Sequence, residues 1–278
     1  MAPTLDHTSY PDLMDAIIAH SDFGALLALR AASRAYRDRV DALLLSDVGL
    51  APAKKAHFDP SWPSAWPALV IEYDGRVLPL PPSAVYTLTI PRGTVPADAG
   101  NDLLDKFTAL RVLRLTEAPD TFYPVADTVV YAIPMQARGT MDAEARRVVL
   151  HVALDGTDTS HVDVDAECSV LDLVLWRKGP DIPLYAVCSL VLDMLFVPGR
   201  TNTVVGASEL WVGVGDDDAA RRLLDAVRAQ GQQQGIDGLL DGFDDRLDAV
   251  RFVSHSQWFE ELGDDRQAVG DWVLGLPL

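Results

Sequence analysis

A short apolar strand recurs along most of this 278-residue chain, and its spacing constrains the possible folds more than any other feature. Eight segments of strand length start between residues 85 and 249, and six of the seven intervals between their starts measure 18–25 residues. Such intervals are too long for tight hairpin turns and suit a strand with a compact return, so we expect parallel neighbours. The last interval, 41 residues long, contains an amphipathic helix expected at 216–230. The expected strands are 85–90, 110–116, 128–133, 148–154, 170–176, 190–197, 208–214 and 249–254.

Some of these segments carry alternate leucines, as the strands of leucine-rich repeats do. Leu110, Leu113 and Leu115 give the best match, and looser versions follow in two later segments. Alternate leucines would point into a core, and the residues between them would line an open concave face. We therefore expect an α/β fold, an irregular leucine-rich-repeat-like solenoid with a mainly parallel sheet. An α+β alternative stays open, because the segments between 146 and 176 could form an antiparallel meander.

Three short helices are predicted before the strands begin. Pro11 suits the first turn of a helix, where its missing N–H would have no intrahelical partner. Asp22 and Ser33 can act as N-caps of a second and a third helix, since their side-chain oxygens can accept from backbone N–H groups. Helices of this length are marginal alone, so their apolar faces need a neighbour or a partner.

The stretch 10–45 resembles the F-box family. The resemblance rests on a leading aromatic residue with proline and an acid, an isoleucine pair, a leucine run and a Ser-Arg-x-Tyr step, which are Tyr10, Pro11, Asp12, Ile17, Ile18, Leu26, Leu27, Leu29, Ser33, Arg34 and Tyr36. It implies docking on a Skp-type linker protein and, through it, on a cullin ubiquitin ligase. The residues that it implies in linker binding are Tyr10, Pro11, Leu13, Ile17, Ile18, Leu26, Leu29 and Tyr36. The alternative is a helical cap on the domain that follows.

The C-terminal stretch 250–272 places a strand before a helix expected at 257–262. Together with residues 86–91, it is similar to F-box-like proteins of basidiomycete yeasts, which extends the resemblance to both ends of the chain. Trp258, Phe259 and Trp272 are large apolar residues at the place where a solenoid needs its open end covered, so we expect them to cap the core.

Three regions follow from these patterns. Residues 8–48 form an expected F-box-like motif, and residues 67–278 an expected leucine-rich-repeat-like recognition domain. Between them, at 49–66, the periodicity stops amid prolines and tryptophans, which is typical of an irregular linker.

The acidic composition narrows the classes of partner. Forty-one acidic residues against 23 basic ones give a formal net charge of −18, which repels nucleic-acid phosphates and anionic membranes. We expect neither kind of partner, and a protein target that is favoured when basic. Cys168 and Cys188 cannot form a disulfide framework, and residues 1–9 lack a basic secretory leader. Both observations favour a cytoplasmic or nuclear location.

Two motifs could indicate a cofactor or metal site, and each has a simpler interpretation. The run VGVG at 212–215 is similar to half of a dinucleotide-binding loop, but the aspartates at 216–218 would repel a phosphate and cap the helix instead. His161, Asp163 and Asp165 have a spacing that a hard divalent ion could use. Polar alternation beside a turn is, however, typical of a solvated strand.

No catalytic set emerges from the sequence. Ser-His-Ser at 254–256 suits a polar strand end better than part of a triad, because no neighbouring base would orient a nucleophile. We expect no cofactor or metal, and interpret the chain as a non-enzymatic adaptor that brings a target to a ubiquitin ligase. The alternative is a stand-alone scaffold whose N-terminal helices only cap the solenoid. Exposure of Ile17, Ile18, Leu26 and Leu29 separates the two, since a cap buries them and an unbound F-box leaves an apolar patch open.

Overall fold

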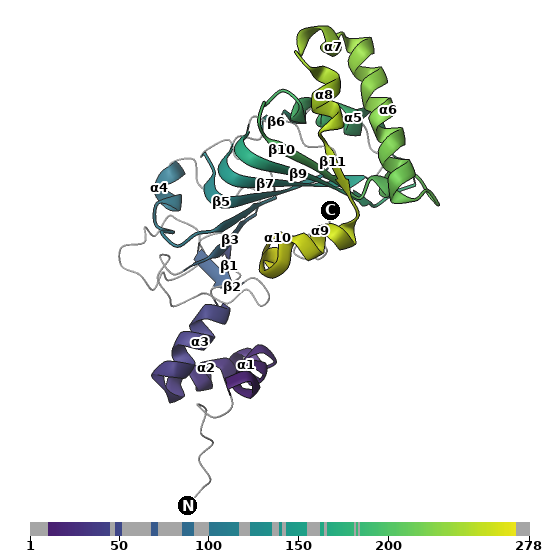
Figure 1. The fold of residues 1–278 in the computed structure, drawn as a ribbon. Helices are drawn as coiled ribbons and strands as arrows, with labels where there is room; N and C mark the ends of the chain where they lie inside the picture. The colour runs from purple at the N-terminus through teal and green to yellow at the C-terminus, as the bar shows by residue number, and fades with distance from the viewer. Residues whose placement is uncertain are drawn as a thin grey trace, which may run out of the picture.

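The computed structural model describes most of the chain from Pro11 to Gly270 (Figure 1). The described residues are 11–44, 48–51, 68–71, 85–91, 100–116, 123–134, 139–140, 143–154, 162–163, 166–180, 182 and 184–270.

Three helices come first, strands predominate up to residue 177, and helices alternate with single strands after it. The strands are β1 (Val48–Ala51), β2 (Ala68–Ile71), β3 (Thr87–Ile90), β4 (Val112–Leu115), β5 (Val125–Pro134), β6 (Gly139–Thr140), β7 (Ala143–Leu154), β8 (Val162–Asp163), β9 (Ala166–Arg177), β10 (Thr201–Val205) and β11 (Arg251–Val253). The helices are α1 (Pro11–Ala19), α2 (Phe23–Ala32), α3 (Arg34–Leu44), α4 (Gly100–Leu104), α5 (Leu184–Met194), α6 (Asp216–Gln234), α7 (Ile236–Leu239), α8 (Phe243–Asp248), α9 (His255–Leu262) and α10 (Arg266–Val269), with 3₁₀ turns η2 (Ala207–Leu210) and η3 (Gly263–Asp265).

One mostly parallel sheet organises these elements. In the described part of the chain its order is β11-β10-β9-β7-β5-β4-β3-β1-β2, and β6 and β8 pair in a small separate sheet. Neighbouring strands of the main sheet are parallel except for β1 and β2. The spatial order from β3 to β11 follows the chain. The expected α/β class with a mainly parallel sheet is thus confirmed, and the antiparallel meander is excluded because β7 and β9 pair in parallel.

Two of the expected strands are wrong. Segment 190–197 lies largely in α5, which is buried on most sides, so its leucine pattern reflects a helix enclosed by the core. Segment 208–214 lies in η2 and the turn after it. The strand of this region is β10. It was not predicted because its first three residues, at 201–203, are polar. The other six expected strands each overlap β3, β4, β5, β7, β9 or β11, and α6 covers the expected helix at 216–230.

Helices cover both faces of the sheet, with α5–α8 on one side and α9–α10 on the other (Figure 1). Because side chains alternate along a strand, Leu113 faces the α5–α6 side and Val112 the α9–α10 side. The α5–α6 side holds the main core. The α9–α10 side holds a smaller second core, formed by Val112, Val130, Val149, Val174, Val205, Trp258, Leu262 and Val269.

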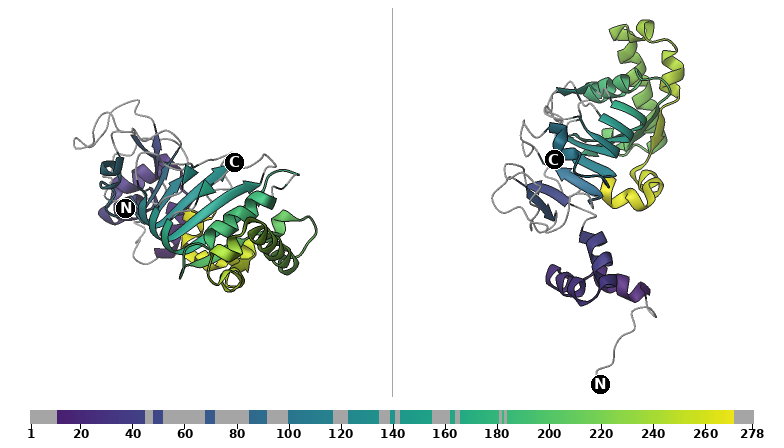
Figure 2. Two further views of the ribbon diagram at one scale, coloured as in Figure 1. Left: turned by 90° about the horizontal axis from the view of Figure 1, so that it is seen from above. Right: turned by 90° about the vertical axis from the view of Figure 1, so that its left-hand side faces the viewer.

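Helices α1–α3, called the helix trio below, lie beyond the β1–β2 edge of the sheet (Figures 1 and 2). Asp22 Oδ1 accepts from the N–H of Ala25 at 2.8 Å, and Ser33 Oγ accepts from the N–H of Tyr36 at 3.2 Å. Both predicted N-caps are therefore confirmed. The main core continues from the trio into the sheet through Val48, because β1 starts only four residues after α3 ends. Residues 49–51 of the expected linker belong to β1, so this part is a strand and not irregular. The remainder, at 52–66, lies outside the described residues.

Within the described ranges, no helix has the length and apolar character to cross a membrane. Cys168 on β9 and Cys188 on α5 are free thiols.

Candidate protein-docking surfaces

Helix α1 has two apolar faces, and only one of them serves the chain itself. Met14 and Ile18 are buried. Leu13 and Ile17, also four residues apart and so on one side of the helix, remain 51% and 41% exposed. An exposed apolar stripe on a helix whose other face is already packed is a candidate docking surface.

The contacts that hold the three helices of the trio together do not involve Leu13 or Ile17. The hydroxyl of Tyr36 lies 4.0 Å from the sulfur of Met14, and Arg39 pairs with Asp15 at 3.1 Å, so both contacts join α3 to α1. A second ion pair between Arg30 and Asp41, at 2.5 Å, joins α2 to α3. Leu27 on α2 and Leu43 on α3 are also exposed. The outer apolar side chains are thus available without disturbing the packing of the trio.

The eight residues that the F-box resemblance implies in linker binding differ in their exposure to solvent. Tyr10 lies outside the described residues; Pro11, Leu13 and Ile17 are exposed; Leu29 and Tyr36 are half-buried; Ile18 and Leu26 are buried. The two buried residues belong to the main core. They can therefore shape the trio but do not present a surface.

A second surface is the face of the sheet on which α9, η3 and α10 lie. These elements, residues 255–269, are called the C-terminal strap below. Three polar contacts from buried side chains of the sheet hold it. Arg114 Nε donates to the carbonyl oxygen of Ala268 at 2.6 Å, His151 Nε2 lies 2.8 Å from the carbonyl oxygen of Val269, and Trp258 Nε1 donates to Asp172 at 3.1 Å.

The two contacts of His151 determine its tautomer. Trp176 Nε1–H donates to His151 Nδ1 at 2.9 Å, so Nδ1 is the acceptor and Nε2 carries the proton given to Val269. Burial lowers the pKa of His151 to about 3, an effect that the bond to Val269 opposes and the nearby His255 reinforces. The imidazole is neutral at physiological pH, and a proton on Nδ1 would break the bond from Trp176.

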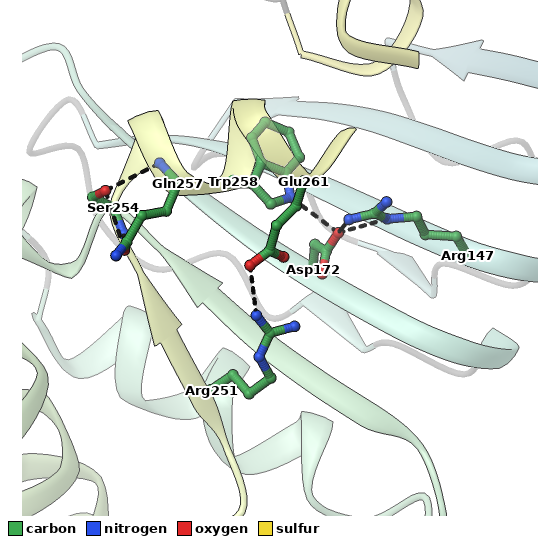
Figure 3. A network of polar contacts seen from close by, with 7 residues as sticks. All are labelled: Arg147, Asp172, Arg251, Ser254, Gln257, Trp258 and Glu261. Carbon is green, nitrogen blue, oxygen red and sulfur yellow. Dashed lines mark hydrogen bonds and ion pairs between the residues drawn. The ribbon is translucent and has the colours of Figure 1, made fainter. Parts of the chain in front are cut away.

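Asp172 joins the sheet to the strap (Figure 3). Its Oδ2 accepts from Arg147 Nε on the neighbouring strand at 2.7 Å and from the indole of Trp258 on α9. The Asp172 side chain is buried, and these donors satisfy its Oδ2.

A capping box stabilises the start of the strap, and a cation–π contact joins α9 to α10 near its end. Ser254 and Gln257 form a reciprocal capping box at the start of α9, so Ser254 is a helix cap and not the polar strand end that the sequence suggested. Arg266 lies over the ring of Phe259, 4.7 Å from its centre. Trp258 covers the face of the sheet and not its open end, which corrects the expected position; Trp272 lies outside the described residues.

No family model, curated protein or solved structure matches this chain.

The motifs with a possible enzymatic meaning form no site among the described residues. Gly215 is the N-cap of α6, so the aspartates at 216–218 are not the cap residue but fill the first turn, where the helix dipole favours carboxylates. Asp218 pairs with Arg221 at 2.6 Å. Of the possible metal ligands, His161 and Asp165 lie outside the described residues, and the described part contains no cluster of three metal-ligating side chains.

A cavity of about 390 Å³ lies beside the end of α5. Two of its polar residues, Arg200 and Asn202, both donate to the carbonyl of Met194 at 2.9 Å. Arg246, also in its wall, donates to the carbonyl of Leu195. These side chains satisfy the C-terminal carbonyls of α5 and its following turn, which is a structural role.

The polar residues beneath the strap were not predicted from the sequence. Arg114, His151 and Asp172 each interrupt an apolar strand at a position facing away from the main core. Strand register places Arg114 and Asp172 in one row across the sheet and His151 in the next row along the strands. A search for polar residues on the outward face of otherwise apolar strands would have found them, but their register required the structure.

Proposed function

We propose that this chain is a non-enzymatic adaptor whose helix trio docks on a Skp-type linker protein of a cullin ubiquitin ligase, while its sheet domain, an irregular leucine-rich-repeat-like solenoid, binds a target protein. The observation that supports this most is the exposed stripe of Leu13 and Ile17 on a helix already packed through Met14 and Ile18. These exposed residues are among those that the F-box resemblance implies in linker binding.

The arrangement of the two parts favours the same function. The helix trio lies beyond one edge of the sheet, and the strap lies on the sheet's face, so the two candidate surfaces belong to different parts of the chain (Figure 1). Exposed acidic side chains gather on the helical part that follows η2, at Asp216, Asp217, Asp218, Asp237, Asp241, Asp244, Asp245 and Asp248. They favour encounter with a basic target on that side.

A stand-alone scaffold is the second candidate. It is favoured by Ile18 and Leu26, because both belong to the same core as the sheet. In that case the trio would serve only to cover the β1–β2 end of the sheet, and its outer stripe would have no partner.

Titration with a purified Skp-type linker distinguishes the two functions. Full-length protein with both Leu13→Asp and Ile17→Asp should bind the linker at least roughly thirtyfold more weakly than the unmodified chain, since a central apolar anchor contributes about 2 kcal/mol. Leu239→Asp, on the 79% exposed Leu239 of α7, is the matched control and should bind normally. Absence of binding by the unmodified chain, or normal binding by the double variant, would contradict the adaptor function.

A further inference from the structure

The C-terminal strap is packed on a core of its own. Its three buried apolar residues, Trp258, Leu262 and Val269, contact the second core, which is distinct from the main core that joins the sheet to α5 and α6. Removing the strap would therefore leave the main core intact. A segment that buries only a small satellite core can open without unfolding the whole domain.

The polar groups beneath the strap keep partners when it leaves. Asp172 retains Arg147, and His151 retains the N–H of Trp176. Water can reach the remaining bonding groups of Arg114 and His151, because the face would then open to solvent. Opening the strap therefore leaves Asp172 and His151 with a protein partner and exposes Arg114 to water.

The uncovered face would have the character of a recognition surface. Five valines, one from each of five neighbouring strands, form its centre, namely Val112, Val130, Val149, Val174 and Val205. Arg114 and Arg251 lie in the same row across the sheet as Val130 and Val149, and Arg147 lies in the row of Val112. A contiguous apolar patch with a polar rim is typical of an interaction site.

The strap itself indicates what this face recognises. Two of its three polar contacts go to main-chain carbonyls at the end of α10, so Arg114 and His151 bind the negative end of a helix whatever its side chains are. The third contact requires an indole N–H at Asp172. A fourth, exposed contact pairs Glu261 of the strap with Arg251 at 2.7 Å (Figure 3).

We propose that the strap is a built-in ligand of this face, and that the face binds a helical segment of a partner protein that carries a tryptophan, an acidic residue and a free helix C-terminus in the same arrangement. The partner helix competes with the strap for the valines, Asp172 and Arg251. The strap opens first and thereby sets the apparent affinity. This surface selects an acidic helix, although the net charge of the chain favours basic proteins elsewhere, and it is independent of whether the helix trio binds a linker.

Hydrogen exchange of the unmodified full-length chain tests the opening step. Amides of residues 258–270 should exchange at least about tenfold faster than those of 148–154 and 171–177, because the strap opens separately from the sheet. Equal protection of the two regions would mean that the strap opens only with global unfolding, which would overturn the proposal.

Peptide binding tests the recognition step. The probe is a labelled synthetic peptide of residues 254–270, added to full-length Trp258→Ala, in which the chain's own strap is weakened. This variant should bind the peptide at least about tenfold more tightly than the unmodified chain, whose strap occupies the face. Trp211→Ala, at a partly buried tryptophan of the main core, is the matched control and should gain no binding. The same peptide with Trp258→Ala should not bind either variant.

Two results of the peptide experiment would overturn the proposal. One is a Trp258→Ala chain that keeps its circular dichroism spectrum yet binds no peptide. The other is a Trp258→Ala chain that loses the whole sheet, since a displaceable strap cannot be essential to the main core.

Discussion

His151 makes the stability of this protein depend on pH in a defined direction. Its pKa is lowered from 6.5 to about 3 by burial, so between these values the unfolded chain binds a proton that the folded chain does not. The stabilisation is complete above pH 6.5 and is lost progressively as the pH falls toward 3.

The pH dependence can be measured by urea unfolding at a series of pH values. His151→Gln keeps a donor and an acceptor but does not titrate, so its free energy of unfolding should fall less steeply on acidification, by roughly 1.4 kcal/mol per pH unit in the middle of this window. His20→Gln, at an exposed histidine after α1, is the control for the substitution itself. An unchanged slope for His151→Gln would contradict the assigned role of the imidazole.

Gly206 and Gly213 have nearly the same backbone conformation in different surroundings, with φ of +73° and +75°. A Cβ on Gly206 would lie 2.3 Å from the ring of His255, whereas one on Gly213 would have nothing within 4 Å. We expect Gly213→Ala to cost about 1 kcal/mol of stability, for the left-handed conformation alone. Gly206→Ala adds the clash and should cost about 3 kcal/mol. Equal costs in denaturant unfolding would show that the His255 ring yields easily.

At the scale of the element, α1 offers a matched pair of neighbours. Ile18 is buried and Ile17 is 41% exposed. Ile18→Ala should therefore lower the free energy of unfolding of the trio by about 3 kcal/mol, and Ile17→Ala by less than about 1 kcal/mol. Per folded molecule, Ile17→Ala should weaken linker binding more than Ile18→Ala, because only Ile17 faces outward. Equal effects of the two substitutions on stability would place both side chains inside.

The sequence predicted the elements that have a strict local signal. Helix starts with a capping side chain, such as Asp22 and Ser33, and six strands with a β-branched or leucine-rich run were found close to their true positions, whereas β1 and β2 were not predicted. Helix α5 was misassigned because a helix buried on most sides loses the polar face that reveals its period. The short strand β10 was not predicted because its first half is polar and so lacks the apolar run of a buried strand.

The candidate sites could be predicted only in part, because burial depends on contacts far apart in sequence. The isoleucine pair of α1 was selected from the sequence, but which member faces outward follows from the packing of α3 against α1. The strap contacts join residues 86 to 154 positions apart, so no local pattern could reveal them.

At the scale of the whole molecule, the helix trio and the sheet domain should unfold at different denaturant concentrations. The trio consists of helices of 9–11 residues, which are marginal alone, and it is joined to the sheet through the end of α3 and β1. All six tryptophans lie outside the trio, at positions 62, 66, 176, 211, 258 and 272. Trp176, Trp211 and Trp258 lie in β9, directly after η2 and in α9, so their fluorescence follows the sheet domain, whereas far-ultraviolet circular dichroism follows both parts.

We expect the helical signal to begin falling before the fluorescence changes, and a Skp-type linker to shift only that first phase. A linker present at about 100 times its dissociation constant should stabilise the trio by about 2.7 kcal/mol, because it binds the folded trio and not the unfolded one. Leu13→Asp with Ile17→Asp should abolish the shift while leaving the fluorescence transition unchanged. Coincident transitions that the linker does not move would identify the trio as a cap that folds with the sheet, which is the scaffold function and not the adaptor.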